Sequence, residues 1–214
     1  MIQNKQLLFI FLPAIAVVGF AFFVRVIQYE PLYPKETANT NEPATFQVPI
    51  HPSDPILGDK KASVTVIAFE DFSCESCKAE QAILDELLRL YPKKLKVILK
   101  GVPASHFPFD TRMAHEYAYC ANQQGKFNEF MHMAFVNSEN LSPETVQTIA
   151  TQIPLNDKKL TACLESGEAQ QYVAYNEQIA TALNVQAVPA MFIDNSQVNP
   201  PGTVEGWQEL LGIQ

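Results

Sequence analysis

The hydrophobic residues are distributed along the chain in three patterns. Residues 7–24 form one uninterrupted apolar run, bracketed by Lys5 and Arg25. Residues 25–62 are mostly polar and carry six of the fifteen prolines. From residue 63 to 214, short apolar runs alternate with stretches in which apolar side chains recur every three or four positions. The pattern predicts a membrane anchor, a tether and one domain of 152 residues with a single core.

The apolar run is long enough to span a membrane. At about 1.5 Å per residue, the nineteen uncharged positions between Lys5 and Arg25 form a helix that matches a hydrocarbon core of about 30 Å. A cleaved signal peptide is the alternative, but it needs small residues at the cleavage site, and residues 22–25 (FFVR) supply none. We therefore expect an uncleaved single-pass signal anchor over residues 1–24. The basic residues on its two sides are nearly balanced, so charge does not set its orientation.

Residues 25–62 are expected to form a proline-rich tether. Proline removes backbone hydrogen-bond donors and restricts φ, so such a segment is a semi-rigid spacer. It is expected to hold the following domain away from the membrane surface.

The domain begins with a strand, a helix and a second strand. Residues 63–69 (SVTVIAF) are β-branched and aromatic, which is typical of a buried strand. Apolar residues then recur at helical spacing up to Pro92, and residues 95–99 (LKVIL) indicate another strand. This order predicts a βαβ unit with two parallel strands and a right-handed crossover. The basic residues between Arg89 and Lys100 are expected to lie in a solvated turn with exposed lysines.

Strand signals are missing between residues 104 and 183, where helical spacing dominates. The fold prediction is therefore α/β, with a frame at residues 63–103 and 184–214 and an all-helical insertion at residues 104–183. The expected elements after the βαβ unit are helices at 111–123 and 127–135, a third opened by Ser142-Pro143, a fourth from Asn156 to Gly167, a fifth at 168–183, a strand at 190–194 and a helix at 204–211.

Composition excludes several classes of protein. A formal net charge of -8 argues against nucleic acid as the partner, because phosphate binding requires a basic surface. A hydrophobic content of 47% excludes wholesale disorder. Four cysteines in 214 residues are too few for a disulfide-rich miniprotein, so any disulfide either supplements the core or performs chemistry.

The candidate chemistry is concentrated in Cys74-Glu75-Ser76-Cys77, which follows the first strand and opens the first helix. The first thiol lies where unpaired backbone N–H groups and the helix dipole stabilise a thiolate. A thiolate exchanges with a disulfide through a mixed disulfide, which the second cysteine resolves. A C-x-x-C pair alone is a weak signal, but the same pair inside a βαβ unit is a much stronger indication of thiol–disulfide chemistry.

Val188-Pro189 directly precedes the strand predicted at residues 190–194. Together with the strand, the C-x-x-C pair and the helix, it resembles the thioredoxin superfamily, in which a cis proline faces the redox cysteines. The helical insertion narrows the resemblance to the DsbA-like thiol:disulfide oxidoreductases, whose motifs here read EDF-x-C-x-x-C at residues 70–77 and CA-x-x-QGKF at residues 120–127. The resemblance covers residues 58–214. It implies that Cys74 is the exposed nucleophile, Cys77 the buried resolving cysteine and Pro189 the cis proline that meets the substrate backbone.

The chain departs from these relatives at two places that tune redox chemistry. Glu75 and Ser76 stand where relatives usually have proline followed by an aromatic residue or histidine. A carboxylate beside the thiolate disfavours its charge, so the pKa of the reactive thiol is predicted to lie nearer the thioredoxin value of about 7 than the strong-oxidant value of about 3.5. Ala68 stands where many relatives place an acid in the first strand. Glu70 or Asp71 is the candidate replacement for that proton acceptor.

Cys120 and Cys163 both follow the apolar pattern of the insertion. Two buried free thiols are one interpretation, because free cysteine behaves as a small hydrophobe. In an oxidising compartment a structural disulfide between them is favoured, and related proteins sometimes pair these positions.

A zinc site built on the C-x-x-C pair is another use of the cysteines. Its further ligands would come from Cys120, Cys163, His115 or His132, but the second pair of a zinc knuckle is missing from the spacing. We therefore expect no metal and no cofactor. His106 is a candidate for lining the redox groove, although an ordinary loop position is the simpler interpretation.

The combined prediction is a membrane-anchored thiol:disulfide oxidoreductase that introduces disulfides into exported proteins. Since dithiol oxidants work where proteins acquire disulfides, the domain is expected on the periplasmic side of a bacterial cytoplasmic membrane. Expected partners are reduced or unfolded exported proteins and, from the resemblance, a quinone-linked membrane oxidase or a membrane thiol donor. The domain is expected to act as a monomer. Two alternatives stay open: a reductase or isomerase of the same fold, and a non-catalytic thioredoxin-like binding or metal-carrying module.

Overall fold

The computed structural model describes Phe20 and residues 47–213. The chain divides into two units, Met1–Ala44 and Thr45–Gln214. The predicted anchor, apart from Phe20, and the tether up to residue 46 lie outside the described residues. Within the described part, no helix has the length and apolar character needed to cross a membrane.

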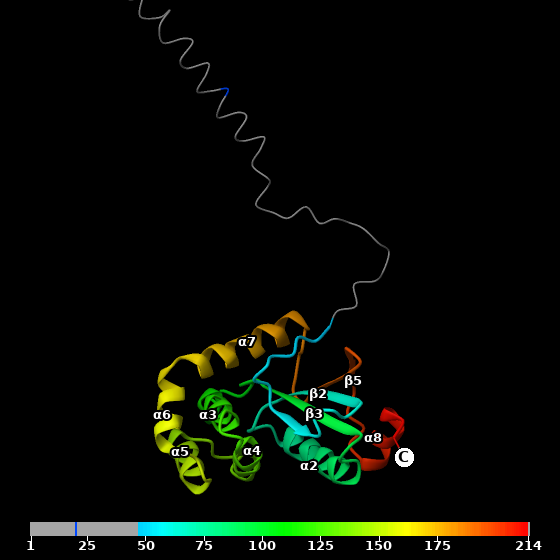
Figure 1. Cartoon of the computed structure of the whole chain (residues 1–214), viewed down its shortest axis with the longest axis horizontal. Coiled ribbons are helices and arrows are strands. Elements are labelled where there is room, and N and C mark those ends of the chain that lie inside the picture. Colours follow the sequence, from blue (N-terminus) through cyan, green and yellow to red (C-terminus); the bar gives the residue numbers. More distant parts are fainter. Residues whose placement is uncertain (1–19, 21–46, 214) are drawn as a thin grey trace, which may run out of the picture. The chain divides into compact units, whose positions relative to one another are not determined.

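The second unit is built on a five-stranded mixed sheet (Figure 1). The strands are β1 (Ile56–Gly58), β2 (Val64–Glu70), β3 (Leu95–Gly101), β4 (Ala190–Ile193) and β5 (Ser196–Val198), in the order β1-β3-β2-β4-β5. β2 and β3 are parallel, and the other neighbouring pairs are antiparallel. Helix α2 (Glu75–Leu90) connects the parallel pair, as the βαβ prediction requires.

Both faces of β2 are covered, which explains why its sequence is apolar without alternation. Val66 and Ala68 pack in the core cluster that includes residues of α2 and of the last helix, α8 (Val204–Leu211). Ile67 and Phe69 pack in a second cluster with residues of α7 (Glu168–Ala182). Glu70, at the end of the strand, is buried as well.

Residues 104–183 contain only helices and connecting loops, as predicted (Figure 1). The helices are α3 (Arg112–Asn122), α4 (Phe127–Val136), α5 (Pro143–Gln152), α6 (Asp157–Glu165) and α7. Ser142 and Asn156 act as the predicted N-caps, since their side chains accept hydrogen bonds from the backbone N–H groups three residues later. Gly167 adopts φ 80°, a left-handed conformation that separates α6 from α7.

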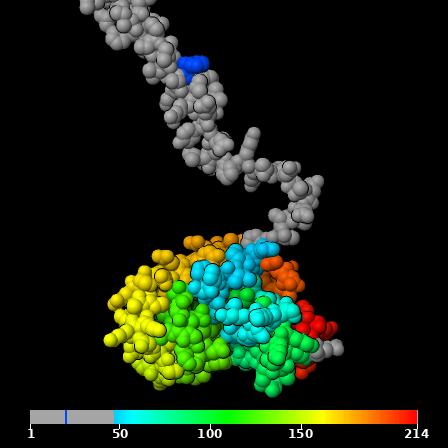
Figure 2. Space-filling view, in the orientation of Figure 1, coloured from blue at the N-terminus to red at the C-terminus, as the bar shows by residue number. Residues whose placement is uncertain are grey.

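The domain begins earlier than residue 63. Strand β1 lies within the stretch assigned to the tether and pairs antiparallel with β3. Val48 is buried, and its N–H donates to Asn195 Oδ1 at 3.0 Å. Figure 2 shows the first described residues of the domain, in light blue, packed on the same surface as its green and orange parts. The predicted tether boundary at residue 62 therefore lies too far along the chain, because prolines that resemble a spacer here precede a three-residue strand.

A buried polar cluster connects this early segment to strand β3 and to helix α7. The ammonium group of Lys100 on β3 lies 2.6 Å from Asp54 Oδ2, and both side chains are fully buried. The hydroxyl of Tyr172 on α7 donates to Asp54 Oδ1 at 2.7 Å. Burial lowers the pKa of Lys100, and the adjacent Asp54 carboxylate opposes that shift. Lys100 is therefore not one of the exposed lysines that the basic run predicts.

Candidate active site

Cys74 lies between the end of β2 and the first residue of α2, where it is the N-cap of the helix. Its backbone is extended, with φ -85° and ψ 113°, and its sulfur accepts a hydrogen bond from the Cys77 N–H at 3.1 Å. The first N–H groups of a helix have no partner within the helix, and the helix dipole is positive at this end. The N-cap position therefore stabilises negative charge on Cys74 when the disulfide is open.

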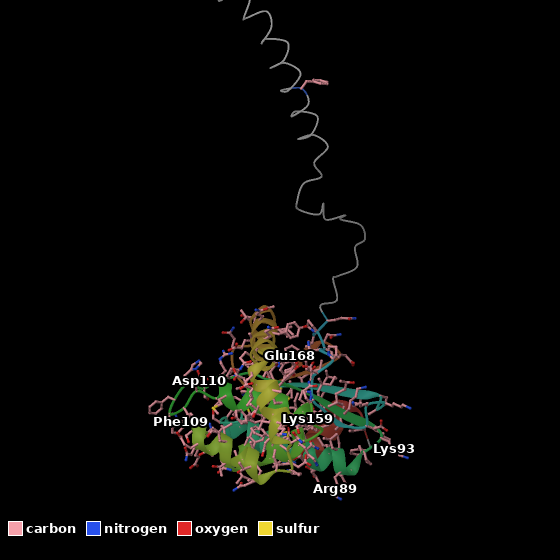
Figure 3. All side chains as sticks on the ribbon, turned by 60° about the vertical axis from the view of Figure 1, so that its left-hand side comes forward. Arg89, Lys93, Phe109, Asp110, Lys159 and Glu168 are labelled. Carbon is pink, nitrogen blue, oxygen red and sulfur yellow. A yellow bond between two sulfur atoms is a disulfide. The ribbon has the colours of Figure 1, made fainter. Side chains whose placement is uncertain are left out.

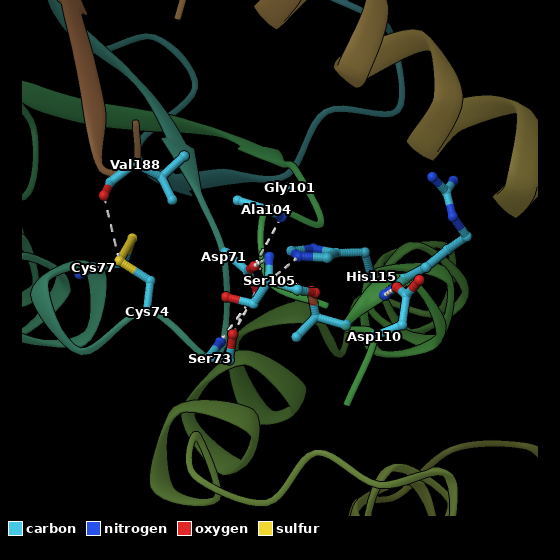
Figure 4. A network of polar contacts seen from close by, with 12 residues as sticks. Asp71, Ser73, Cys74, Cys77, Gly101, Ala104, Ser105, Asp110, His115 and Val188 are labelled. Carbon is cyan, nitrogen blue, oxygen red and sulfur yellow. Dashed lines mark hydrogen bonds and ion pairs between the residues drawn. A yellow bond between two sulfur atoms is a disulfide. The ribbon is translucent and has the colours of Figure 1, made fainter. Parts of the chain in front are cut away.

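Cys74 and Cys77 form a disulfide with a Cα–Cα distance of 5.2 Å (Figure 4). Cys77 is completely buried, whereas Cys74 is partly exposed. An incoming thiol can therefore reach Cys74, and Cys77 can be reached only through its partner. The motif predicts attack at Cys74 and resolution by Cys77, an order that this difference in exposure allows.

Pro189 follows a cis peptide bond with Val188. The carbonyl oxygen of Val188 lies 3.5 Å from Cys74 Sγ, so the two segments meet at the sulfur (Figure 4). The register explains the meeting, because β4 begins directly after Pro189 and pairs Ala190 with Phe69 of β2. The end of β2 thus presents the cysteines beside a proline that breaks the pairing of the neighbouring strand.

The two residues between the cysteines face different surroundings. Ser76 Oγ lies 3.2 Å from Cys74 Sγ, so the hydroxyl can hydrogen-bond to the sulfur. The Glu75 side chain is 77% exposed, and Lys78 Nζ lies 4.0 Å from its carboxylate. Because both side chains of this ion pair are exposed, it contributes little stability.

Asp71 connects the redox turn to the beginning of the insertion. Its main-chain oxygen accepts the Cys74 N–H at 3.1 Å. Its buried carboxylate lies at the centre of the polar network in Figure 4. The groups around the carboxylate are the N–H of Ser73 (3.2 Å), the N–H of Ala104 (2.9 Å), the N–H of Ser105 (2.7 Å), the hydroxyl of Thr111 (3.1 Å) and Nε2 of His115 (3.5 Å).

The polar partners determine the charge of Asp71. Burial alone would raise its pKa, but hydrogen bonding to His115, the charge on that ring, and the N–H groups of Ser73 and Ser105 lower the pKa to about 2. Asp71 is therefore ionised near neutral pH and cannot accept a proton from a thiol there. Its position favours a role in holding the turn before Cys74 and the loop after β3.

Glu70 shows the opposite behaviour. Burial, followed by the charges of Glu80 and Asp85, raises its pKa to about 8. Its Oε1 has no hydrogen-bond partner among the described residues. Glu70 is also one of the residues that line a cavity of about 20 Å³, enough for one water molecule. Of the two acids proposed to replace the one missing at Ala68, only Glu70 can exchange a proton near neutral pH.

His115, which the sequence suggests only as a possible zinc ligand, lies instead beside Asp71, with Nε2 3.5 Å from the carboxylate. Its ring stacks on Phe72 with centroids 4.5 Å apart. Gly101 allows the close approach, because a Cβ at that position would lie 2.3 Å from His115 Nδ1. The one sequence feature that points to this contact is the glycine at the end of β3, and a glycine alone does not identify the side chain that packs against it.

The other candidates lie in different surroundings. Cys120 and Cys163 form a disulfide with an S–S distance of 2.07 Å, which connects α3 to α6 inside the insertion. Among the described residues, no group of three or more histidine, cysteine or acidic side chains could hold a metal ion. His106 is exposed, and its Nδ1 lies 3.5 Å from Asp110 Oδ2. Nδ1 of His132 lies 3.8 Å from Asp85 Oδ2.

A family model described as thioredoxin matches residues 51–212. The chain belongs to the thioredoxin family. A solved thioredoxin-like oxidoreductase from Silicibacter pomeroyi DSS-3 is 22% identical, with a TM-score of 0.66 and coverage of 76% of this chain and 92% of that one. The thiol-disulfide exchange protein alpha-DsbA2 from Wolbachia pipientis is 20% identical, with a TM-score of 0.65 and coverage of 75% and 86%. These similarities show a DsbA-like thioredoxin fold. In this chain the helices α3 to α7 are inserted into that fold.

A curated relative, the Na(+)/H(+) antiporter NhaA 3 of Salinispora tropica, is 24% identical over 161 residues, which are 75% of this chain. The chain spans about a quarter of that protein's length, 24%. The antiport activity in that name is a property of the longer protein, and we do not assign it to this chain. The family match and the C-x-x-C disulfide thus place a bonded cysteine pair in a thioredoxin-family chain.

Proposed function

We propose that this thioredoxin-family chain is a membrane-anchored, extracytoplasmic oxidoreductase that introduces disulfides into exported proteins. The observation that carries the proposal is the bonded pair at the start of α2, with Cys74 reachable and Cys77 buried. Pro189, in a cis peptide bond beside that sulfur, provides a place for the substrate backbone.

The proposed reaction transfers two electrons from substrate to protein. A substrate thiolate attacks Cys74 Sγ, which forms a mixed disulfide, breaks the Cys74–Cys77 bond and releases Cys77 as a thiolate. A second substrate thiolate then attacks the substrate sulfur of the mixed disulfide and releases the Cys74 thiolate. The substrate loses two electrons and two protons, and the pair gains the electrons. Glu70 and solvent are the proposed exchange partners for the proton that Cys77 takes up.

Extracytoplasmic location is part of the proposal. The disulfide inside the insertion is typical of proteins in oxidising compartments. The apolar run at residues 7–24 supports an anchor. An extracytoplasmic domain after such an anchor implies an amino terminus in the cytoplasm. A quinone-linked membrane oxidase is the proposed partner that restores the disulfide after each turnover.

A reductase or isomerase of the same fold is the second candidate. The observation that favours it is Glu75, whose exposed carboxylate follows Cys74 directly and disfavours the thiolate. A less stable thiolate makes the oxidised pair a weaker oxidant.

Two parallel assays on the full-length protein test the proposed function. In one, the oxidised protein acts on a reduced, unfolded protein substrate, and in the other the reduced protein acts on insulin. Faster substrate oxidation supports the proposal, and faster insulin reduction supports the second candidate. If Cys74→Ala is as active as the natural protein in both assays, neither reaction is the function.

A further inference from the structure

Glu75 is the charged side chain nearest in sequence to the sulfur that partners can reach. It follows Cys74 in the chain, begins α2 and is 77% exposed. Because Cys77 is completely buried, an incoming sulfur must approach Cys74. Groups attached to that sulfur therefore pass close to the Glu75 carboxylate.

Other charges near Cys74 compensate little for this carboxylate. The segment that meets Cys74 from the other side, residues 184–189 (NVQAVP), has no ionisable side chain. Asp71 is completely buried, and backbone N–H groups surround its carboxylate. Lys78 lies 4.0 Å from Glu75, at the limit of an ion pair, and is itself 40% exposed. Of this exposed pair, Glu75 directly follows Cys74 in the chain, so its carboxylate is the charge that adjoins the reactive sulfur.

We propose that Glu75 is a specificity-determining residue that selects thiol partners by charge, favouring cationic over anionic groups beside the reacting sulfur. The inference rests on the proposed function, since it concerns exchange at Cys74. In proteins, the preferred substrate cysteine is one with lysine or arginine close to it in sequence.

Coulomb's law sets the expected size of the effect. A unit charge about 7 Å from the carboxylate in water has an interaction energy close to thermal energy, which changes a rate by about threefold. A cationic and an anionic partner therefore differ by about tenfold at low ionic strength. Because the Debye length falls from about 10 Å at 0.1 M salt to about 3 Å at 1 M, most of this difference is lost at high salt.

Three small thiols of similar size test the proposal on the full-length oxidised protein. They are 2-aminoethanethiol, 2-mercaptoethanol and mercaptoacetate, which carry a cationic, a neutral and an anionic group. In each reaction the thiolate bonds to Cys74 Sγ, the Cys74–Cys77 bond breaks, and Cys77 leaves with the electron pair and then takes a proton. Acid quenching followed by mass spectrometry measures the initial rate of disulfide opening.

The measured quantity is the rate of Glu75→Gln divided by the rate of the natural protein for each thiol. This ratio cancels the intrinsic reactivity of the thiol, and any general effect on the cysteines is the same for all three. Glu86→Gln is the matched control, since it makes the same change in net charge about 17 Å further along α2. Its ion-pair partner Arg89 lies on the opposite side of the domain from Phe109 and Asp110 (Figure 3).

The proposal predicts that the ratio is about tenfold larger for mercaptoacetate than for 2-aminoethanethiol in low salt. The difference should shrink to about twofold or less in 1 M salt, and Glu86→Gln should show no such order. Equal ratios for the three thiols would overturn the role of Glu75. If the natural protein opens its disulfide no faster than a protein with a non-catalytic surface disulfide, the proposed function fails, and the inference fails with it.

Discussion

Cys74 and Cys77 are bonded across one turn of helix, whereas Cys120 and Cys163 are bonded across 43 residues inside the helical insertion. The first pair has a partly exposed sulfur in contact with the Cys77 N–H and the Val188 carbonyl. The second pair lies in a cluster of tyrosine, leucine and alanine side chains. The same covalent bond therefore performs different tasks, because the first pair has polar partners at its partly exposed sulfur, whereas the second pair is surrounded mainly by apolar side chains.

The largest expected effect is the loss of exchange when the first pair is broken. Cys74→Ala should lower the rate of substrate oxidation by about a thousandfold or more, because Cys77 is buried and cannot replace the nucleophile. Stopped reactions with a reduced protein substrate measure the rate. A variant that keeps a tenth of the natural rate would show that the reactive sulfur lies elsewhere.

Breaking the second pair should affect stability and leave activity in place. The double variant Cys120→Ala/Cys163→Ala should lose up to about 4 kcal/mol of unfolding free energy, since the bond closes a loop of about 40 residues in the unfolded chain. Its exchange rate should stay within about twofold of the natural rate at temperatures where it is folded. Urea unfolding and the oxidation assay measure the two quantities. A large loss of activity in the folded variant would contradict the division of tasks.

Asp71→Asn sharpens the contrast, because it alters the polar surroundings of the first pair without touching a cysteine. The amide removes the charge that the N–H groups of Ala104 and Ser105 face, so we expect a loss of about 2–3 kcal/mol in unfolding free energy. The reduction potential of the pair should change as well, because the turn that precedes Cys74 loosens. Asp110→Asn is the matched control, since Asp110 is exposed. Identical potentials in all three proteins would leave Asp71 with a purely structural role.

A further expected effect is a change in how the free energy of unfolding depends on pH. The pKa of Glu70 is about 8 in the folded protein, above its usual value of 4.5, so the folded state binds more protons than the unfolded state between these pH values. The contribution of Glu70 to the free energy of unfolding should therefore be fully present below about pH 4.5. It should fall as pH rises toward 8, by at most about 1.4 kcal/mol per pH unit. Glu70→Gln should remove this decline. Urea midpoints at pH 5, 6, 7 and 8 measure it, and equal slopes for both proteins would refute the assignment.

Local signals explain most of what the sequence predicts correctly. Ser142 and Asn156 cap helices because their side chains bond to N–H groups three residues away, a relation that lies within one short stretch. The βαβ unit was predictable for the same reason, since the strand, the helix and the second strand follow one another directly. The positions of the C-x-x-C pair and of Val188-Pro189 could likewise be read from neighbouring elements.

Contacts between distant segments explain the errors. Lys100 reads as one more surface lysine, because its partner Asp54 lies 46 residues earlier in a stretch that resembles a tether. Glu70 and Asp71 are adjacent acids with opposite pKa shifts, and the difference arises from the N–H groups of Ser73 and Ser105 and from His115. The sequence gives the number of ionisable groups, whereas the fold determines which of them are protonated near neutral pH.

The central claim is that Cys74–Cys77 is the exchanging pair and Cys120–Cys163 the structural one. It is tested most directly by equilibrating the full-length protein with glutathione buffers, alkylating the free thiols and mapping them by peptide mass spectrometry. We predict that Cys74 and Cys77 become alkylated together, at a potential clearly more negative than the strong-oxidant value of about -120 mV, while Cys120 and Cys163 stay bonded. Reduction of Cys120–Cys163 before Cys74–Cys77, or a potential of about -120 mV for the first pair, would contradict the account.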